Sequence, residues 1–470
     1  MIRIIVALLA TLWVDVAVCA PPVPAASQQE ARELLAELVA FDTSAGKGQV
    51  PAMAALLAER LAAAGFEGED IQILPFGDTA SLVVRYRGDG SGGKPILLLA
   101  HMDVVPANPQ DWSRDPFTLV EEDGYFFGRG TEDIKGEIAT IVTTFIRLKR
   151  EGFVPTRDLV IVFTGDEETD QATTRDLIEN HRELIDAEFA LNGDGGGGIL
   201  DDDTGEARLY YLQGAEKSYA SFELSTRNPG GHSSEPRVEN AIYELADALK
   251  ALQAFQFPVM SNEWTRASLA AAGAATPGEL GTALTRFAAN PDDVAAANIL
   301  AAEPAYVGRT RTTCVATMLA AGHAENALPQ RATATVNCRI FPGTATAAVG
   351  ETLREVVGDK VEVKLVSAEF DSVASPLRPD VLSAVEDAVR ANHPGIQVVP
   401  DQASYYTDGS FFRGGGIPTY GTSSLFVRNR DSFAHGLNER ISVEAFQGGL
   451  NHWYVLIRNL ATGSSGAPTL

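Results

Sequence analysis

An apolar run that ends in three consecutive acids constrains this chain more than any other feature. The segment DLVIVFTGDEE, residues 158–168, places Asp166, Glu167 and Glu168 directly after the run. Two similar runs, SLVVRY and PILLLAH, alternate with helix-like stretches at 138–149 and 173–181. This alternation predicts an α/β fold built on a mostly parallel sheet with helices on both faces. Ligands collect at the carboxyl ends of strands in such sheets, and His101 and Glu167 both lie at strand ends.

A change of pattern near residue 214 indicates a second unit. The segment KSYASFELSTR alternates like an antiparallel strand, and an Ala-rich helical region follows it from residue 240. Two β-like runs and the strand KVEVKLVS come next, and helix and strand alternation returns after residue 369. We therefore expect an α+β unit at 214–368, inserted into a catalytic domain that is formed by 27–213 and 369–470.

Five short motifs carry residues that suit metal chemistry. Adjacent carboxylates at a buried strand end repel one another unless protons or cations neutralise them, which favours a metal site after the first run. In AHMDVVP, His101 and Asp103 face the same way on an extended chain, so the carboxylate can orient the imidazole. In FGRGTEDIKG, glycines let the backbone fold closely around Asp133, whose two oxygens can bridge two cations. The remaining motifs are LNGDGGGG, with Asp194, and FAHGLNERIS, with His435.

Together these motifs resemble those of the aminoacylase and carboxypeptidase family of di-zinc hydrolases, which includes glutamate carboxypeptidase, carnosinase and succinyl-diaminopimelate desuccinylase. The resemblance covers nearly all of the chain after residue 26, in the family's order and approximate spacing. It implies a di-zinc exopeptidase-type catalytic domain with an inserted α+β lid. It also implies the ligands: His101, Asp133 and Asp194 for one zinc, and Asp133, Glu168 and His435 for the other.

The same resemblance implies that Asp103 orients His101 and that Glu167 is the general base. Two cations that share Asp133 would lower the pKa of a bridging water and polarise the scissile carbonyl. Glu167 would take the proton of that water and pass it to the leaving nitrogen. Imidazole and carboxylate ligands without thiolate suit zinc, so we expect two Zn²⁺ per subunit, with Co²⁺ or Mn²⁺ as alternatives.

The lid unit contains further matches to the family. NPGGHSSEP resembles the motif whose histidine stabilises the tetrahedral oxyanion, which implies a catalytic role for His232. In dimeric members this histidine comes from the partner subunit, so the resemblance implies a homodimer through the lid. GHAENALPQRATATVNCRIFPG resembles the segment that meets the substrate's carboxylate, which implies Asn326 and Arg339, and the planar fork of arginine suits a carboxylate. TYGTSS, with Gly421 and Thr422, resembles a substrate-facing loop.

The expected function is hydrolysis of an amide bond in short peptides by a metalloexopeptidase or dipeptidase that resembles carboxypeptidases. One departure leaves the direction of cleavage open, because Asp194 stands where carboxypeptidase-like relatives usually have Glu. The alternative substrate is an N-acyl amino acid, which would need an apolar trough, whereas a peptide needs a counter-charge for its ammonium group. A non-catalytic binding protein on the same fold is a third hypothesis, disfavoured because Glu167 and every ligand are present. The acids Asp201 to Asp203 are expected in an exposed hairpin turn.

The overall charge and the N-terminal segment indicate which partners the protein can bind and in which compartment it works. The formal charge of −25, from 62 acidic and 37 basic residues, disfavours binding to nucleic acid and to anionic lipid surfaces. Residues 1–26 resemble a signal peptide, with Arg3 before an apolar stretch and cleavage near Ala20 or Ala26. We therefore expect a secreted or periplasmic protein without stable membrane insertion, with a retained membrane anchor as the alternative.

Two cysteines follow this N-terminal segment. Cys314 and Cys338 lie on two β-like runs, TTCVATML and ATATVNCRIF. They could form a disulfide in an oxidising compartment or remain as buried thiols, and the sequence leaves both alternatives open. No Cys-x-x-Cys pair is present to hold a structural zinc.

Overall fold

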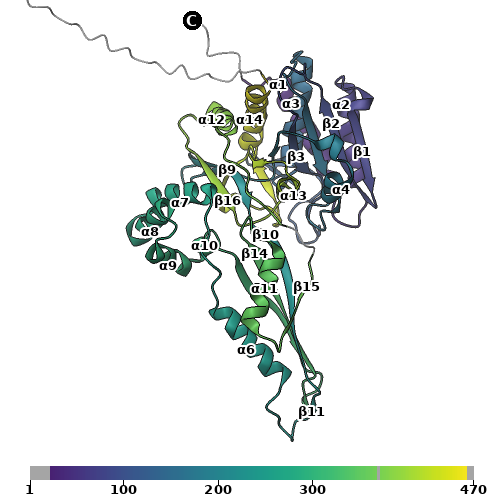
Figure 1. The fold of residues 1–470 in the computed structure, drawn as a ribbon. Helices are drawn as coiled ribbons and strands as arrows, with labels where there is room; N and C mark the ends of the chain where they lie inside the picture. Colours follow the sequence, from purple (N-terminus) through teal and green to yellow (C-terminus); the bar gives the residue numbers. More distant parts are fainter. Residues whose placement is uncertain (1–21, 368–370, 463–470) are drawn as a thin grey trace, which may run out of the picture.

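A computed structural model describes residues 22–367 and 371–462 (Figure 1). It has a broad α/β part, which we call the catalytic domain, and an elongated part, which we call the lid. The lid extends away from the catalytic domain, and β11 (Gly231–His232) lies at its far tip.

A ten-stranded sheet forms the centre of the catalytic domain. Its strands follow the order β1-β2-β6-β3-β7-β17-β9-β8-β18, and β16 pairs with β9. The strand β3 (Ile96–His101) lies parallel to both β6 (Leu159–Thr164) and β7 (Phe189–Asn192), so these three strands end at one edge. The runs PILLLAH and DLVIVFT are thus central strands, as predicted. The other strands are β1 (Ile71–Phe76), β2 (Thr79–Tyr86), β8 (Gly197–Leu200), β9 (Ala207–Glu216), β16 (Val398–Ala403), β17 (Thr419–Gly421) and β18 (Phe426–Arg428).

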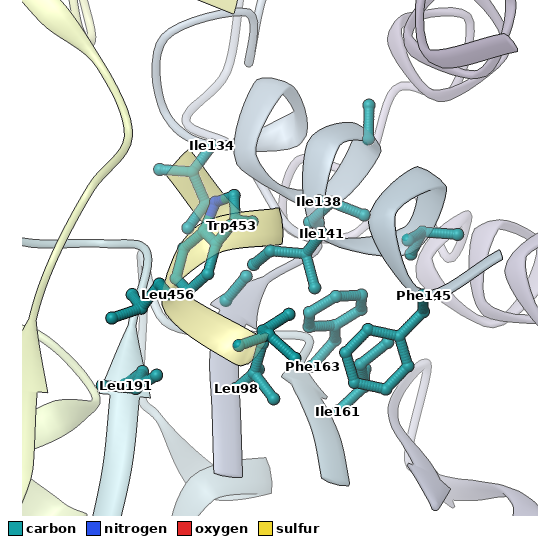
Figure 2. Close-up of a cluster of buried hydrophobic side chains, with 14 of the residues drawn as sticks. Leu98, Ile134, Ile138, Ile141, Phe145, Ile161, Phe163, Leu191, Trp453 and Leu456 are labelled. Atoms are coloured by element: carbon teal, nitrogen blue, oxygen red, sulfur yellow. The ribbon is translucent and has the colours of Figure 1, made fainter. Parts of the chain in front are cut away.

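The central strands are apolar on both sides because helices cover both faces of the sheet, which confirms the predicted fold class. Leu98 and Ile161 pack in one core with α3 (Lys135–Arg150) and α14 (Val443–Ala461), as Figure 2 shows. Leu97 and Val160 point the opposite way, into a second core. Helices α1 (Ala25–Val39), α2 (Val50–Ala63) and α12 (Pro379–Asn392) join the first core, and α4 (Ala172–Asn180), α5 (Arg182–Ile185) and α13 (Gly409–Gly414) join the second.

The helix α3 connects the hydrophobic core to the edge of the sheet at which β3, β6 and β7 end. Its Ile138, Ile141 and Phe145 recur at three- and four-residue steps and point toward the sheet (Figure 2). Complete burial of each of these side chains stabilises the fold by roughly 1.5–3 kcal/mol. Arg147, Lys149 and Arg150 occupy the last turn, where positive charge complements the helix dipole. Because the helix begins at Lys135, the core also fixes the loop that precedes it.

The lid is a four-stranded antiparallel sheet in the order β12-β14-β10-β15, covered by two helices. Phe222 of the sheet packs with Leu245 and Leu353 of the helices. The chain enters the lid from β9, and only Lys217 separates β9 from the first strand of the lid, β10. The elements are β10 (Ser218–Arg227), α6 (Ala241–Ala254), β12 (Thr313–Ala321), β14 (Arg331–Ile340), α11 (Thr346–Val357) and β15 (Glu362–Leu365), with β13 (Ala327–Leu328) paired to β11 at the tip.

The two cysteines form a disulfide. Cys314 lies directly opposite Cys338 in the register of β12 and β14, and their sulfur atoms are bonded. Of the two alternatives that the sequence leaves open, the structure shows the disulfide.

A helical arm departs from the expected division of the chain. It consists of α7 (Glu263–Ala275), α8 (Gly278–Ala289), α9 (Val294–Ala302) and α10 (Pro304–Val307), all inside the range 214–368 that was expected to form the lid. The arm lies beside β16 (Figure 1), and Trp264 is fully buried in the core of the catalytic domain. Its indole donates a hydrogen bond of 2.7 Å to the backbone oxygen of Ser375. The ring lies against Gly214, where even a Cβ atom would overlap it. By its packing, the arm belongs with the catalytic domain.

The expected signal peptide falls mainly on residues 1–21, which lie outside the described part of the chain. The helix α1 begins at Ala25, so Ala26, one of the two expected cleavage points, lies in its first turn. Among the residues that the structure describes, no helix is both long enough and apolar enough to span a bilayer. The turn at Asp201 to Asp203 joins β8 to β9 as a hairpin, as expected, but only Asp203 of these acids is exposed and the other two are partly buried.

Candidate metal centre and active site

Three parallel strands bring together side chains that are far apart in the sequence. His101 is the last residue of β3, Glu167 and Glu168 follow β6, and Asp194 follows β7. Because these strands are neighbours with the same direction, their carboxyl ends form one edge of the sheet. Thr164 Oγ1 at the end of β6 also bonds the buried carboxylate of Asp408, which ties α13 to this edge.

Asp133 reaches the same edge from the loop before α3, and the peptide bond between Asp133 and Ile134 is cis. The backbone N–H groups of Glu132 and Asp133 donate to Glu439 Oε1 at 2.8 and 3.0 Å. Arg129 Nη1 donates to the other oxygen of Glu439 at 2.5 Å, and both side chains of this pair are buried. Burial raises the pKa of Glu439 to about 7, which the charge of Arg129 opposes. Sequence reasoning missed Glu439, although it lies within the motif FAHGLNERIS.

Two groups of candidate ligands share Asp133. His101 Nε2 lies 3.0 Å from Asp133 Oδ1 and 3.9 Å from Asp194 Oδ2. His435 Nε2 lies 3.0 Å from Asp133 Oδ2 and 2.9 Å from Glu168 Oε1. In each group one atom from each residue lies within 4.8 Å of the others. The two groups match the two sets that the resemblance implies.

The electrostatics of the cluster suit cations. Burial raises the pKa of Asp194 well above its usual range, and the neighbouring charge of Asp133 adds to this effect. The hydrogen bonds of His435 to Asp133 and Glu168 raise the pKa of His435 to about 10. Without a metal, the three carboxylates must be balanced by protons on themselves or on the imidazoles. Divalent cations neutralise the same charge, and carboxylate with neutral imidazole is a donor set that zinc accepts. The residues present therefore fit a dinuclear metal centre.

Glu167 lies beside the cluster and belongs to neither ligand group. Gln171 Nε2 donates to its Oε1 at 3.1 Å. Burial raises the pKa of Glu167 well above its usual range, and the charge of Asp194 raises it further. A carboxyl group with a raised pKa can accept a proton from water and release it again near neutral pH.

Asp103 makes two kinds of contact at this edge. Its backbone oxygen lies 3.0 Å from His101 Nδ1, and its nearer carboxylate oxygen lies 3.4 Å from the same atom. The carboxylate also accepts the backbone N–H groups of Glu167 and Glu168, each at 3.0 Å. Asp103 therefore positions the acidic loop as well as the imidazole, a second contact that the sequence did not predict.

Of the three site residues expected from the lid, one lies at the cavity and two lie far from it. Arg339 on β14 lines the central cavity, and its guanidinium lies 5.1 Å from the centre of the Tyr219 ring. His232 and Asn326 are exposed near the far tip of the lid (Figure 1), and neither lines this cavity. Within one chain, the structure therefore does not bring His232 and Asn326 to the ligand cluster.

The cavity over the cluster has a volume of about 1010 Å³. The residues that line it include the glycines at 195–198, Tyr405, Tyr406 and Arg175, none of which the sequence singled out as site residues. Ser423 of the loop TYGTSS and Leu425, the residue after the loop, line the cavity. Thr422 is instead buried against Tyr210 and His452. The loop faces the site as expected, but through residues that follow the expected pair.

Comparisons with known proteins agree with this geometry. Residues 97–459 match the model of peptidase family M20/M25/M40. The chain is 28% identical to N-fatty-acyl-amino acid synthase/hydrolase PM20D1 of Homo sapiens over 385 residues, which cover 80% of this chain and 76% of that protein. It is 29% identical over 392 residues to probable carboxypeptidase S-like 2 of Dictyostelium discoideum, covering 81% and 74%.

Among solved structures, the M20 family metallo-carboxypeptidase Sso-CP2 of Sulfolobus solfataricus superposes with a TM-score of 0.70. At 18% identity it covers 92% of this chain and 99% of its own, which shows a shared fold. The resemblance to the aminoacylase and carboxypeptidase family is confirmed. The chain belongs to peptidase family M20/M25/M40 and is an amide-bond hydrolase of that family.

Proposed function

We propose that this protein is a metalloexopeptidase or dipeptidase that cleaves the amide bond of short peptides next to a free carboxylate. One observation carries the proposal: two ligand groups share Asp133, and the carboxyl group of Glu167 lies beside them without belonging to either. With cations bound, this arrangement would provide two electrophilic positions beside a proton acceptor in one cavity.

The metal ligands in this proposal are His101, Asp133 and Asp194 for one cation, and Asp133, Glu168 and His435 for the other. We infer Zn²⁺ at both positions from the imidazole and carboxylate donors, with Co²⁺ or Mn²⁺ as alternatives. When bound, the cations supply Lewis acidity, which polarises a carbonyl group and lowers the pKa of water.

The chain's own residues perform the remaining steps. Glu167 removes a proton from the attacking water and transfers it to the leaving nitrogen, which its raised pKa and its place in the cavity support. Asp103 holds His101 and the backbone of the acidic loop in place. Arg339 binds the substrate's free carboxylate, because its guanidinium reaches the cavity from the lid and can make two parallel hydrogen bonds.

His232 and Asn326 require a second chain to take part in the reaction, because neither lines the cavity of its own chain. We propose a homodimer in which His232 of one subunit stabilises the oxyanion in the other and Asn326 contacts the substrate. The outer strand β12 supports an interface on the lid, because it ends the sheet and exposes Val315, Met318 and Leu319. An exposed apolar edge strand is a template for pairing with another chain.

A second candidate function is hydrolysis of N-acyl amino acids. The similarity to N-fatty-acyl-amino acid synthase/hydrolase PM20D1 favours it, because that relative covers 80% of this chain. The two functions use the same ligands and the same base, and they differ in what the cavity must accept beyond the scissile bond.

We also propose export from the cytoplasm, to the periplasm or to the medium, after removal of an N-terminal signal peptide. The bonded pair Cys314–Cys338 supports an oxidising compartment. N-terminal sequencing of the purified protein tests this point, since a chain that still begins at Met1 would contradict cleavage.

The deciding experiment is a substrate screen of the zinc-loaded protein, with dipeptides beside N-acetyl and N-fatty-acyl amino acids and with a chelated sample as control. Turnover of dipeptides that is lost on chelation is the expected result. Preferential turnover of acyl substrates would establish the second candidate. Absence of turnover with two bound metals would contradict a general activity on either class and would favour a narrower substrate or a binding protein.

A further inference from the structure

Arg175 lies in the wall of the cavity on a firmly held helix. It occupies the first turn of α4, where its backbone N–H donates to Gln171 O at 3.1 Å. The carboxylate of Asp166 anchors this turn by accepting the N–H groups of Ala172 and Thr173 at 2.7 and 3.0 Å. Gln171, one turn before Arg175, contacts Glu167. Arg175 thus lies one helical turn from Gln171, the residue that donates a hydrogen bond to the proposed base.

The guanidinium of Arg175 has no acidic partner among residues 22–367 and 371–462. It lies 5.9 Å from the centre of the Phe411 ring, a contact that orients a planar cation without neutralising it. Arginines nearby are placed differently: Arg413 pairs with Glu216, and Arg182 donates to Gly415 O. Arg175 is therefore a half-buried positive charge that faces the cavity and keeps its hydrogen-bonding capacity for a ligand.

The acids around the cavity do not supply a partner either. Asp133, Glu168 and Asp194 are assigned to cations under the proposed function. Glu132 is engaged by the N–H of Phe433 and the hydroxyl of Ser432. With cations bound, the acids left at the cavity are Glu167, the proposed base, and the exposed Asp170. The positive charges of the protein that line the cavity come from Arg175 and Arg339.

We propose that Arg175 recognises a second carboxylate of the substrate, in addition to the free carboxylate that Arg339 binds, so that the enzyme prefers dianionic substrates. This inference rests on the proposed function and specifies its substrate class. Arg175 projects from the catalytic domain and Arg339 from the lid, and a substrate with two carboxylates can engage both in a cavity of about 1010 Å³. The second carboxylate belongs either to an acidic side chain or to a dicarboxylic acyl group.

The test compares substrates that differ only in this charge. Ala-Glu is measured against Ala-Gln, Glu-Ala against Gln-Ala, and N-succinyl-alanine against its terminal amide, and the three pairs separate the possible positions of the second carboxylate. For at least one pair we expect kcat/KM of the wild-type protein to favour the acid. Arg175→Ala should reduce that ratio on the order of 10- to 100-fold while turnover of the neutral member is kept. Arg175→Lys should restore part of the ratio, because it keeps the charge and loses the planar fork.

Arg390→Ala removes one exposed positive charge from α12, far from the cavity, and serves as the control. A ratio near one for every pair in the wild type, or an unchanged ratio in Arg175→Ala, overturns the inference and leaves the proposed function intact. Calorimetric binding of the same pairs to zinc-loaded Glu167→Gln protein, with and without Arg175→Ala, gives the ratio without turnover. An inactive protein therefore still decides the question, because equal affinities for acid and amide would refute the role of Arg175.

Discussion

Glu439 Oε1 accepts the backbone N–H of Asp133 at 3.0 Å, so a residue that is not itself a candidate ligand holds the ligand shared by both groups. The contact joins two loops that are 306 residues apart in the chain. The second oxygen of Glu439 is held by Arg129 and by the N–H of Gly130.

This relationship predicts that Glu439→Gln weakens metal binding without unfolding the protein. The amide loses the charge that pairs with Arg129, and its NH₂ group cannot accept the hydrogen bonds that Oε1 or Oε2 receives now. A loss of roughly 10- to 100-fold in zinc affinity is expected, as for other residues that orient metal ligands. Competition with a chromophoric chelator measures it. Glu444→Gln, an exposed change on α14, should leave the affinity unchanged.

Glu167→Gln should keep both metals and lose turnover. Glutamine preserves the shape of the side chain but cannot accept a proton, and removal of a general base typically costs roughly 10²- to 10⁴-fold in kcat. Metal content by mass spectrometry and kcat on the best substrate are the measurements. Asp170→Asn is the matched control, because Asp170 is an exposed acid that lines the same cavity. Near-normal turnover in Glu167→Gln would remove Glu167 from the role of base.

The proposed dimer predicts complementation between two inactive chains. Glu167→Gln disables the chain's own site, whereas His232→Ala disables the site of its partner. In a random mixture of the two variants, about one quarter of all sites combine an intact Glu167 with an intact His232 of the other chain. Co-expression should therefore restore about a quarter of wild-type activity. A mixture as inactive as its components would show that the sites do not share residues.

We expect the free energy of unfolding to depend on pH through His452. Burial lowers the pKa of this imidazole to about 3, and the nearby charge of His393 contributes. In the unfolded chain its pKa is about 6.5, so between these values the unfolded state binds a proton that the folded state does not. Its contribution to the free energy of unfolding is complete above pH 6.5 and falls by about 1.4 kcal/mol per pH unit below it.

Denaturation by urea at pH 5, 6 and 7 checks this expectation. His452→Gln should flatten the loss of stability toward pH 5, although it lowers stability at pH 7. His323→Gln, an exposed change on the lid, should retain the wild-type slope. Equal slopes in all three proteins would mean that His452 does not contribute.

Local patterns predicted most of the fold. The runs PILLLAH and DLVIVFT became the central strands β3 and β6, because a continuous apolar run that ends in polar residues is readable in sequence. The ligand set was implied by the family resemblance of the five motifs taken together, not by any one of them alone. Arg175 and Glu439 were not implied, because an arginine in an amphipathic helix and a glutamate in a polar loop are ordinary until distant segments are brought together.

The helical arm shows a second limit of sequence reasoning. Its amphipathic helices are readable, but a helix pattern does not say against which sheet the apolar face packs. The contact between Trp264 and Gly214 shows that the arm packs against the sheet of the catalytic domain.

The same contact also limits which deletions in the arm the protein can tolerate. In sequence the arm is an insertion between α6 and β12, the kind of segment that is usually removable. In space its tryptophan fills a slot that the catalytic domain leaves open along β9. A shortened chain that joined α6 to β12 directly would therefore not yield a smaller lid. It would leave a hydrophobic gap in the enzyme's core, and a bulkier residue at position 214 would be needed to close it.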